Sequence, residues 1–85
     1  MSKEEAFRRI ELCVQAGRKA AKNIGSSPTA AELTIRKDVY VEETKSGVFR
    51  IRVWKHRIIE RALLGGYDTA EAAKAIKQYE QFFNE

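Results

Sequence analysis

A strict alternation of residue types from Val48 to Trp54 is the strongest constraint on the fold of this chain. The alternation separates an apolar set from a basic and aromatic set: Phe49, Ile51 and Val53 against Arg50, Arg52 and Trp54. A period of two predicts a β-strand with one buried face. The other face then carries two guanidinium groups and an indole. That combination favours a binding surface over a plain solvated face, and nucleic acid is the first candidate ligand.

A second strand is predicted from Asp38 to Thr44, and the loop Lys45-Ser46-Gly47 joins the two strands. Glycine ends that loop, where a left-handed backbone is required, and the loop length fixes the register of the hairpin. The register predicts two apolar pairs and four pairs on the other face: Val41 with Ile51, Val39 with Val53, Thr44 with Val48, Glu42 with Arg50, Tyr40 with Arg52, and Asp38 with Trp54. Both strands therefore agree on which face is buried.

Amphipathic helices are predicted on both sides of the hairpin. The first spans residues 2–25, with Ser2 as its N-cap and Gly25 at its end. Its apolar seam is narrow and consists of Phe7, Ile10, Val14, Gly17 and Ala21. Small residues in a seam allow another helix to approach closely. The seam therefore either packs on the sheet of the same chain or binds a second copy or a host protein.

The remaining segments complete an α+β domain that spans residues 1–85: an N-terminal helix, a small antiparallel sheet of two to three strands, and a C-terminal helix packed on the sheet. Residues 26–35 are expected to be a linker, in which Pro28 stands at a position permitted in the first turn of a helix and a short turn of helix can follow it. Residues 36–67 are expected to hold the sheet, although 56–64 fit either a helix or a third strand. The last helix is predicted over 68–84, with Asp68 as its cap.

The charge distribution points to a polyanionic partner. The chain has 85 residues, which suits one domain, and a net charge of +4. From Arg36 to Arg61 there are eight basic and four acidic residues, whereas residues 62–85 carry two basic and four acidic ones. The first helix is basic as well. A polyanion would therefore approach the middle of the chain.

Several function classes are disfavoured. The single cysteine, Cys13, excludes an internal disulfide, and with one histidine, His56, no zinc site can be assembled. We find no nucleophile with a plausible partner and no glycine-rich phosphate loop, so we expect no enzyme, no catalytic residues, no cofactor, no metal and no small-molecule substrate. No apolar stretch is long enough for a signal peptide or a membrane span. We expect a complete cytoplasmic protein that does not bind membranes.

Three phrases in the second half of the chain resemble a known DNA-binding domain: Gly47 to Trp54, Leu64-Gly65-Gly66-Tyr67-Asp68-Thr69, and Glu71-Ala72-Ala73-Lys74-Ala75. The pattern is similar to the domain of plant ethylene-response factors, which also forms the arm-binding N-terminal domain of phage and transposon tyrosine recombinases. The resemblance covers residues 39–83. It implies a three-stranded sheet whose open face lies in the DNA major groove, although the Gly or Asn turn between strands two and three is lacking after Trp54.

The resemblance implies roles for individual side chains. Arg50 and Arg52 would read bases, since arginine contacts guanine through two hydrogen bonds. Trp54, joined by Tyr40 through the hairpin register, would stack on sugars or hold the arginines by cation–π contact. Apart from the resemblance, Lys45 and Lys55 lie at strand ends, where contact with the DNA backbone is more natural, and they are expected to bind phosphates together with Arg57. In the alternative without a binding role, Glu42 and Asp38 pair with the arginines, and the first helix half covers Trp54.

The sequence thus predicts a double-stranded DNA-binding protein, a regulator or accessory factor of a phage or mobile element. Two alternatives remain. A helix-turn-helix from residues 56–64 and 69–82 is less favoured, because the alanine-rich start of the second helix offers few side chains that read bases. A small inhibitor or adaptor that binds a host protein is the stronger rival, since Trp, Tyr and Arg also dominate the energetics of protein interfaces.

Overall fold

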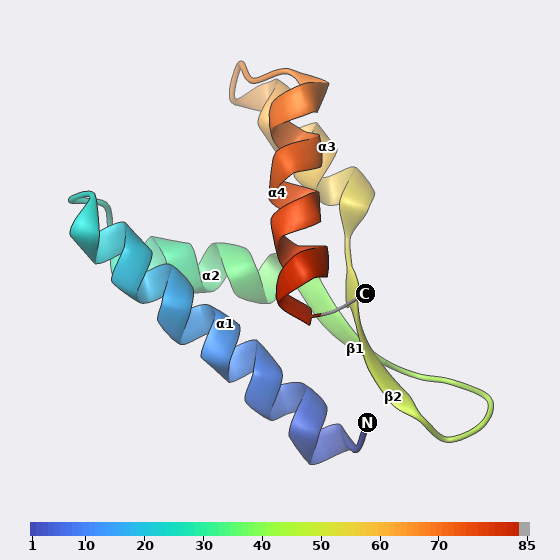
Figure 1. Ribbon diagram of the computed structural model, residues 1–85. Helices are drawn as coiled ribbons and strands as arrows, with labels where there is room; N and C mark the ends of the chain where they lie inside the picture. Colours follow the sequence, from blue (N-terminus) through green and yellow to red (C-terminus); the bar gives the residue numbers. More distant parts are fainter. Residues whose placement is uncertain (84–85) are drawn as a thin grey trace.

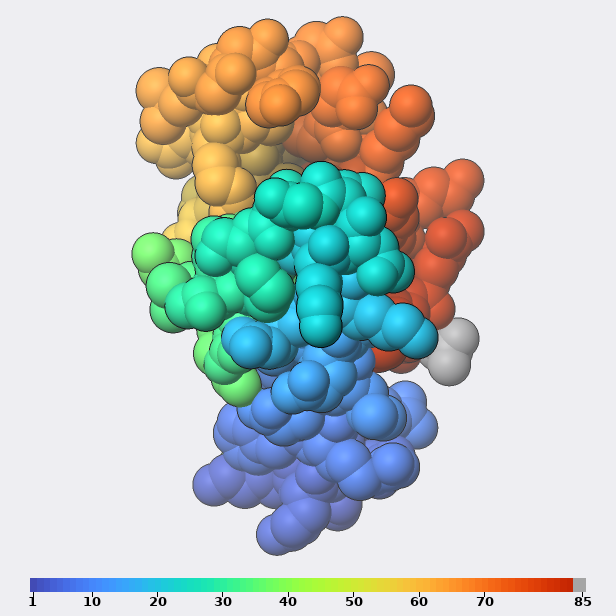
Figure 2. Space-filling view, turned by 90° about the vertical axis from the view of Figure 1, so that its left-hand side faces the viewer, coloured from blue at the N-terminus to red at the C-terminus, as the bar shows by residue number. Residues whose placement is uncertain are grey.

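The computed structural model describes residues 1–83, which form four helices and two strands. In chain order these are α1 (Lys3–Asn23), α2 (Pro28–Asp38), β1 (Val39–Glu43), β2 (Phe49–Val53), α3 (Lys55–Leu64) and α4 (Thr69–Phe83). The α+β class is confirmed. The helices form two pairs, α1 with α2 and α3 with α4, and the β-hairpin joins one pair to the other (Figure 1). In Figure 2 the end of α1 and α2 lie in front, and the turn between α3 and α4 stands above them.

The hairpin has the predicted register. Val39 lies opposite Val53, Val41 opposite Ile51, and Glu42 opposite Arg50. Backbone hydrogen bonds continue the pairing beyond both strand ends, since the amide of Thr44 donates to Val48 at 2.8 Å and that of Trp54 to Asp38 at 2.8 Å. Gly47 has a φ of +78°, the left-handed conformation that the loop requires. Local alternation and turn chemistry are sufficient to set this element.

The predicted linker at residues 26–35 is wrong, because most of it is α2. Ser27 caps this helix by accepting a hydrogen bond from the amide of Ala30 at 3.2 Å, and Pro28 occupies the first turn. The helix continues to Asp38, which was expected to begin the first strand. Its amphipathic pattern is weak, since Leu33 is exposed and Ile35 is its one buried apolar residue. Packing on α1 therefore determines α2 more than its own periodicity does.

The narrow seam of α1 is filled by α2 of the same chain. Ile10, Val14 and Ala21 are buried, and a Cβ added at Gly17 would overlap Cδ1 of Ile35. The seam thus packs on a helix as well as on the sheet. The sequence predicted the close approach of another helix, but not that this helix would come from the same chain. Among the seam residues, Phe7 is the one with large exposure, at 49%. Because this internal packing covers most of the seam, few of its residues remain accessible to a second copy or a host protein.

Residues 55–64 are a helix, which settles the alternative left open for 56–64, and residues 1–83 hold no third strand. The side chain of Ile58 is buried among residues of β2 and α4. A strand over these residues would instead have buried every second side chain. The three-stranded sheet implied by the family resemblance therefore does not form here. Asp68 caps α4, accepting from the amide of Glu71 at 3.0 Å. Asn84, which was expected to end the last helix, lies outside the described residues.

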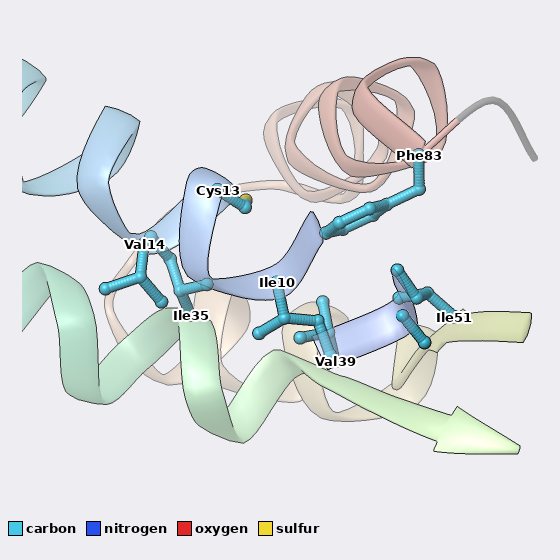
Figure 3. Close-up of a cluster of buried hydrophobic side chains, with 8 residues drawn as sticks. Ile10, Cys13, Val14, Ile35, Val39, Ile51 and Phe83 are labelled. Atoms are coloured by element: carbon cyan, nitrogen blue, oxygen red, sulfur yellow. The ribbon is translucent and has the colours of Figure 1, made fainter. Parts of the chain in front are cut away.

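Two apolar clusters hold the elements together. The larger one contains side chains from α1, α2, both strands and α4, and Ile51 is fully buried within it (Figure 3). Phe83 brings the end of α4 onto the sheet, as predicted for the last helix. The smaller cluster joins α3 to α4 and to Val53 of β2. The apolar face of the hairpin thus contacts both helix pairs.

A buried polar joint links the two helix pairs. Asp38, at the end of α2, is 1% exposed. Its carboxylate accepts hydrogen bonds from Nη1 and Nη2 of Arg61 at 2.6 and 2.8 Å, and from the hydroxyl of Tyr79 at 2.9 Å. Burial, and then the neighbouring Asp38 carboxylate, raise the pKa of Tyr79. The joint ties α2 to α3 and α4, so it sets how the helix pairs sit around the hairpin.

Acid is expected to weaken the contact between α1 and α2. Glu32 of α2 accepts from Arg18 at 2.9 Å and from Arg36 at 3.0 Å. The hydrogen bond from Arg36, above all, lowers the pKa of Glu32 below its ordinary 4.5. A carboxyl group whose pKa is lower in the folded chain stabilises the fold above its unfolded pKa, and that stabilisation is lost as the pH falls through the folded value.

The midpoint temperature of thermal unfolding should therefore decrease as the pH is lowered from about 6 to about 3. Glu32→Gln should remove part of that pH dependence. Far-UV circular dichroism at several pH values measures both. A Glu32→Gln variant with the full pH dependence of the parent chain would contradict the expectation, since it would assign the acid response to other carboxyl groups.

Candidate functional site

The polar face of the hairpin is available to a ligand. Tyr40 and Glu42 of β1 and Arg50 and Arg52 of β2 alternate with the apolar residues that the helices cover. The side chains of Arg50 and Arg52 are 50% and 43% exposed. In Figure 1 the α1–α2 pair lies to one side of the hairpin, and the turn of the hairpin projects beyond the helices. The alternation thus does what the sequence predicted, with one face in the core and the other open.

An aromatic stack stands at the end of this face. The rings of Tyr40 and Trp54 lie 4.2 Å apart between centroids, with 29° between their planes. The guanidinium carbon of Arg57 lies 4.9 Å from the centroid of Trp54, within cation–π range. The indole therefore holds Arg57 of α3, and its ring faces Tyr40 rather than a free space. Trp54 was expected to hold Arg50 and Arg52, whereas the cation–π contact found among the described residues is with Arg57.

Glu42 partly neutralises both arginines of β2. Its Oε2 lies 3.7 Å from Nε of Arg50 and 3.8 Å from Nε of Arg52. Both distances exceed those of a hydrogen bond, so the pairs are loose and solvent-screened. Within residues 1–83, most of the N–H donors of these two guanidinium groups thus have no acceptor. Asp38, the other expected counter-ion, is engaged by Arg61 instead.

A cleft of about 770 Å³ opens beside β2 and combines the predicted residues with others that sequence reasoning missed. We call it the basic cleft. It is lined by Met1, Arg9, Tyr40, Arg50, Arg52, Val53, Trp54, Lys55, His56, Glu80 and Phe83. Arg9 comes from α1, and Glu80 and Phe83 come from α4. The cleft therefore forms only in the folded molecule, because α1 and α4 at opposite ends of the chain both line it.

Five of the seven predicted binding residues line the basic cleft. Lys55 is one of them, although its Nζ lies 3.2 Å from Oε1 of Glu80, so a phosphate would have to compete with that carboxylate. Arg57 does not line the cleft but lies against Trp54, which does. Lys45 sits at the exposed turn of the hairpin and does not line the cleft. His56 lies in the first turn of α3 and lines the cleft.

Other kinds of site receive no support from the described part of the chain. Within residues 1–83, no group of three or more His, Cys, Asp or Glu side chains could hold a metal ion. Burial raises the pKa of the Cys13 thiol, which disfavours the reactive thiolate. None of the helices found within these residues is both long enough and apolar enough to cross a membrane.

The chain matches no protein-family model, no curated protein and no solved structure. The geometry of the hairpin face and of the basic cleft is therefore what bears on function.

Proposed function

We propose that this chain is a non-enzymatic protein that binds double-stranded DNA through the polar face of its β-hairpin, as a regulator or accessory factor. The observation that carries the proposal is the open face itself, where Arg50 and Arg52 flank one loosely paired carboxylate, Glu42, and Trp54 holds the guanidinium of Arg57. The DNA major groove is wide enough to admit a two-stranded β-ribbon, so a third strand is not required.

The proposed roles follow from position. Arg50 and Arg52 project from the middle of the ribbon and would contact base edges, each good pair adding about 1–3 kcal/mol of discrimination. Lys45 and Lys55, near the two ends of the hairpin, would contact phosphates. Arg52→Ala should then relax base preference, whereas Lys55→Ala should weaken binding to all sequences alike.

Fluorescence of Trp54 tests the proposal, because it is the one tryptophan of the chain. Titration with random-sequence duplex DNA should quench it at low salt. If three phosphates are neutralised, affinity should fall about 40-fold between about 50 and 200 mM salt. The double substitution Arg50→Ala, Arg52→Ala should lower affinity at least tenfold, about 1.4 kcal/mol, and Glu42→Gln should raise it a few-fold.

Lys74→Ala is the matched control, because it removes a cation whose side chain is 74% exposed on α4, outside the cleft. Equal losses in Lys74→Ala and in the Arg50, Arg52 variant would leave only a general charge effect and would count against the ribbon as the interface. An unchanged Trp54 signal at both salt concentrations would count against DNA binding altogether.

The second candidate is a small inhibitor or adaptor that binds a host protein. A concave cleft with a Tyr40–Trp54 stack and arginines also suits the anchors of a protein interface. Binding of that kind depends less steeply on salt than binding to several phosphates does. A partner retained from cell extract by the parent chain and lost with Trp54→Ala, in the absence of any DNA response, would favour this candidate.

A further inference from the structure

The basic cleft extends the proposed interface beyond the ribbon. One wall of the cleft is β2, and the other is formed by the start of α1 and the end of α4. We propose, on the premise that the ribbon binds DNA, that this cleft receives the phosphodiester backbone of one strand and that Arg9 of α1 binds one of its phosphates. The first helix would then take part in binding through a charged residue outside its apolar seam.

The charges that line the cleft suit a phosphodiester. Among the described residues, four cationic side chains line it, Arg9, Arg50, Arg52 and Lys55, against one carboxylate, that of Glu80. With Arg50 and Arg52 assigned to base edges, Arg9 and Lys55 are the two that remain for phosphates. The terminal residue Met1 adds its amino group, which donates to the carbonyl of Phe49 at 3.2 Å. A volume of about 770 Å³ is far larger than a small ion needs. A stretch of backbone fits this space and its charge better than an isolated anion does.

Arg9 is positioned for this role by Glu5. The Nε of Arg9 donates to Oε1 of Glu5 at 3.1 Å, one turn earlier on the helix. That bond uses one of the five N–H donors of the guanidinium group, and the two outer nitrogens have no acceptor among residues 1–83, so they can bind a phosphate. The hydrogen bonds from Arg8 and then Arg9 lower the pKa of Glu5 below its ordinary value.

Arg8 provides a control within the same helix. It also bonds to Glu5, with Nη2 2.8 Å from Oε1, but its side chain is 64% exposed and it does not line the cleft. The side chain of Arg9 is 37% exposed. Arg8→Ala and Arg9→Ala therefore remove the same charge, from adjacent positions and from the same carboxylate partner. The two variants differ in whether the lost guanidinium faced the cleft.

The experiment compares the parent chain with Arg8→Ala, Arg9→Ala and Arg9→Lys, using fluorescence anisotropy of a labelled random duplex across a salt series. For Arg9→Ala, the slope of log K against log salt should fall by about one, and low-salt affinity should fall about three- to tenfold. Arg8→Ala should keep the parent slope. Arg9→Lys should restore most of it, because lysine still binds phosphate as a point charge. Thermal melts establish that each variant is folded.

The failures of the two proposals are distinguishable. If the parent chain does not bind the duplex, the proposed function itself is overturned, and this inference falls with it. If the parent chain binds but Arg8→Ala and Arg9→Ala have the same slope and affinity, the ribbon proposal stands and the role of Arg9 is overturned. The role of Arg9 is overturned in the same way if Arg9→Lys binds no better than Arg9→Ala.

Discussion

Arg61→Ala is expected to lower the free energy of unfolding by about 3 kcal/mol, because it leaves a buried carboxylate without its counter-ion. Asp38 is 1% exposed, and without Arg61 it would keep one hydrogen bond from a side chain, that of Tyr79. The value lies at the low end of the usual range for breaking a buried pair. Nearly half of the Arg61 side chain, 48%, faces solvent, so water can partly replace it.

Urea unfolding followed by far-UV circular dichroism measures this loss, with Arg57→Ala as the control one turn earlier on α3. The double variant Asp38→Asn, Arg61→Ala should be more stable than Arg61→Ala alone, because the stranded charge is gone. A cost for Arg61→Ala no greater than that for Arg57→Ala would show that the joint between the helix pairs contributes nothing.

Ile51→Ala is expected to cost about 3 kcal/mol, because it opens a cavity where three helices and the hairpin meet. Ile51 is fully buried in the larger apolar cluster, beside Val39 and Phe83. Removing one methylene group in Ile51→Val should cost about 1 kcal/mol, so the two variants should form a graded series. Val48→Ala, at an exposed position before β2, should change stability by less than about 0.5 kcal/mol.

The same unfolding measurement checks this series. Equal stability of Ile51→Ala and Val48→Ala would mean that the hairpin is not anchored by its apolar face. That result would remove the physical basis for the open face, because a strand with unanchored register can turn either set of side chains to solvent.

The hairpin and the helix caps could be predicted from sequence because the interactions that determine them are local. Gly47 and the alternation that follows it specify the turn and the register, and both are as predicted. Ser2 and Asp68 cap their helices through amides three residues away. The polar face with Arg50 and Arg52 follows directly from that register. In each of these cases the interacting groups are neighbours in the chain or across one short loop.

What only the tertiary structure decided depends on residues that are distant in sequence. The apolar pattern of residues 26–35 is too weak to predict α2. This helix is determined by its packing on α1, where Gly17 leaves space for Ile35. The sequence places Asp38 at the start of a strand, on its polar face. In the fold its carboxylate is buried and binds Arg61, which lies 23 positions later in the chain.

The basic cleft has the same origin, because Arg9 joins the arginines of β2 only when α1 packs against the sheet. A one-dimensional pattern records periodicity and turn chemistry, which are short-range. It does not record which faces meet when apolar surface is buried. Sequence by itself therefore determined the hairpin and its two faces, whereas packing of the helices decided the depth, the charge and the far wall of the site.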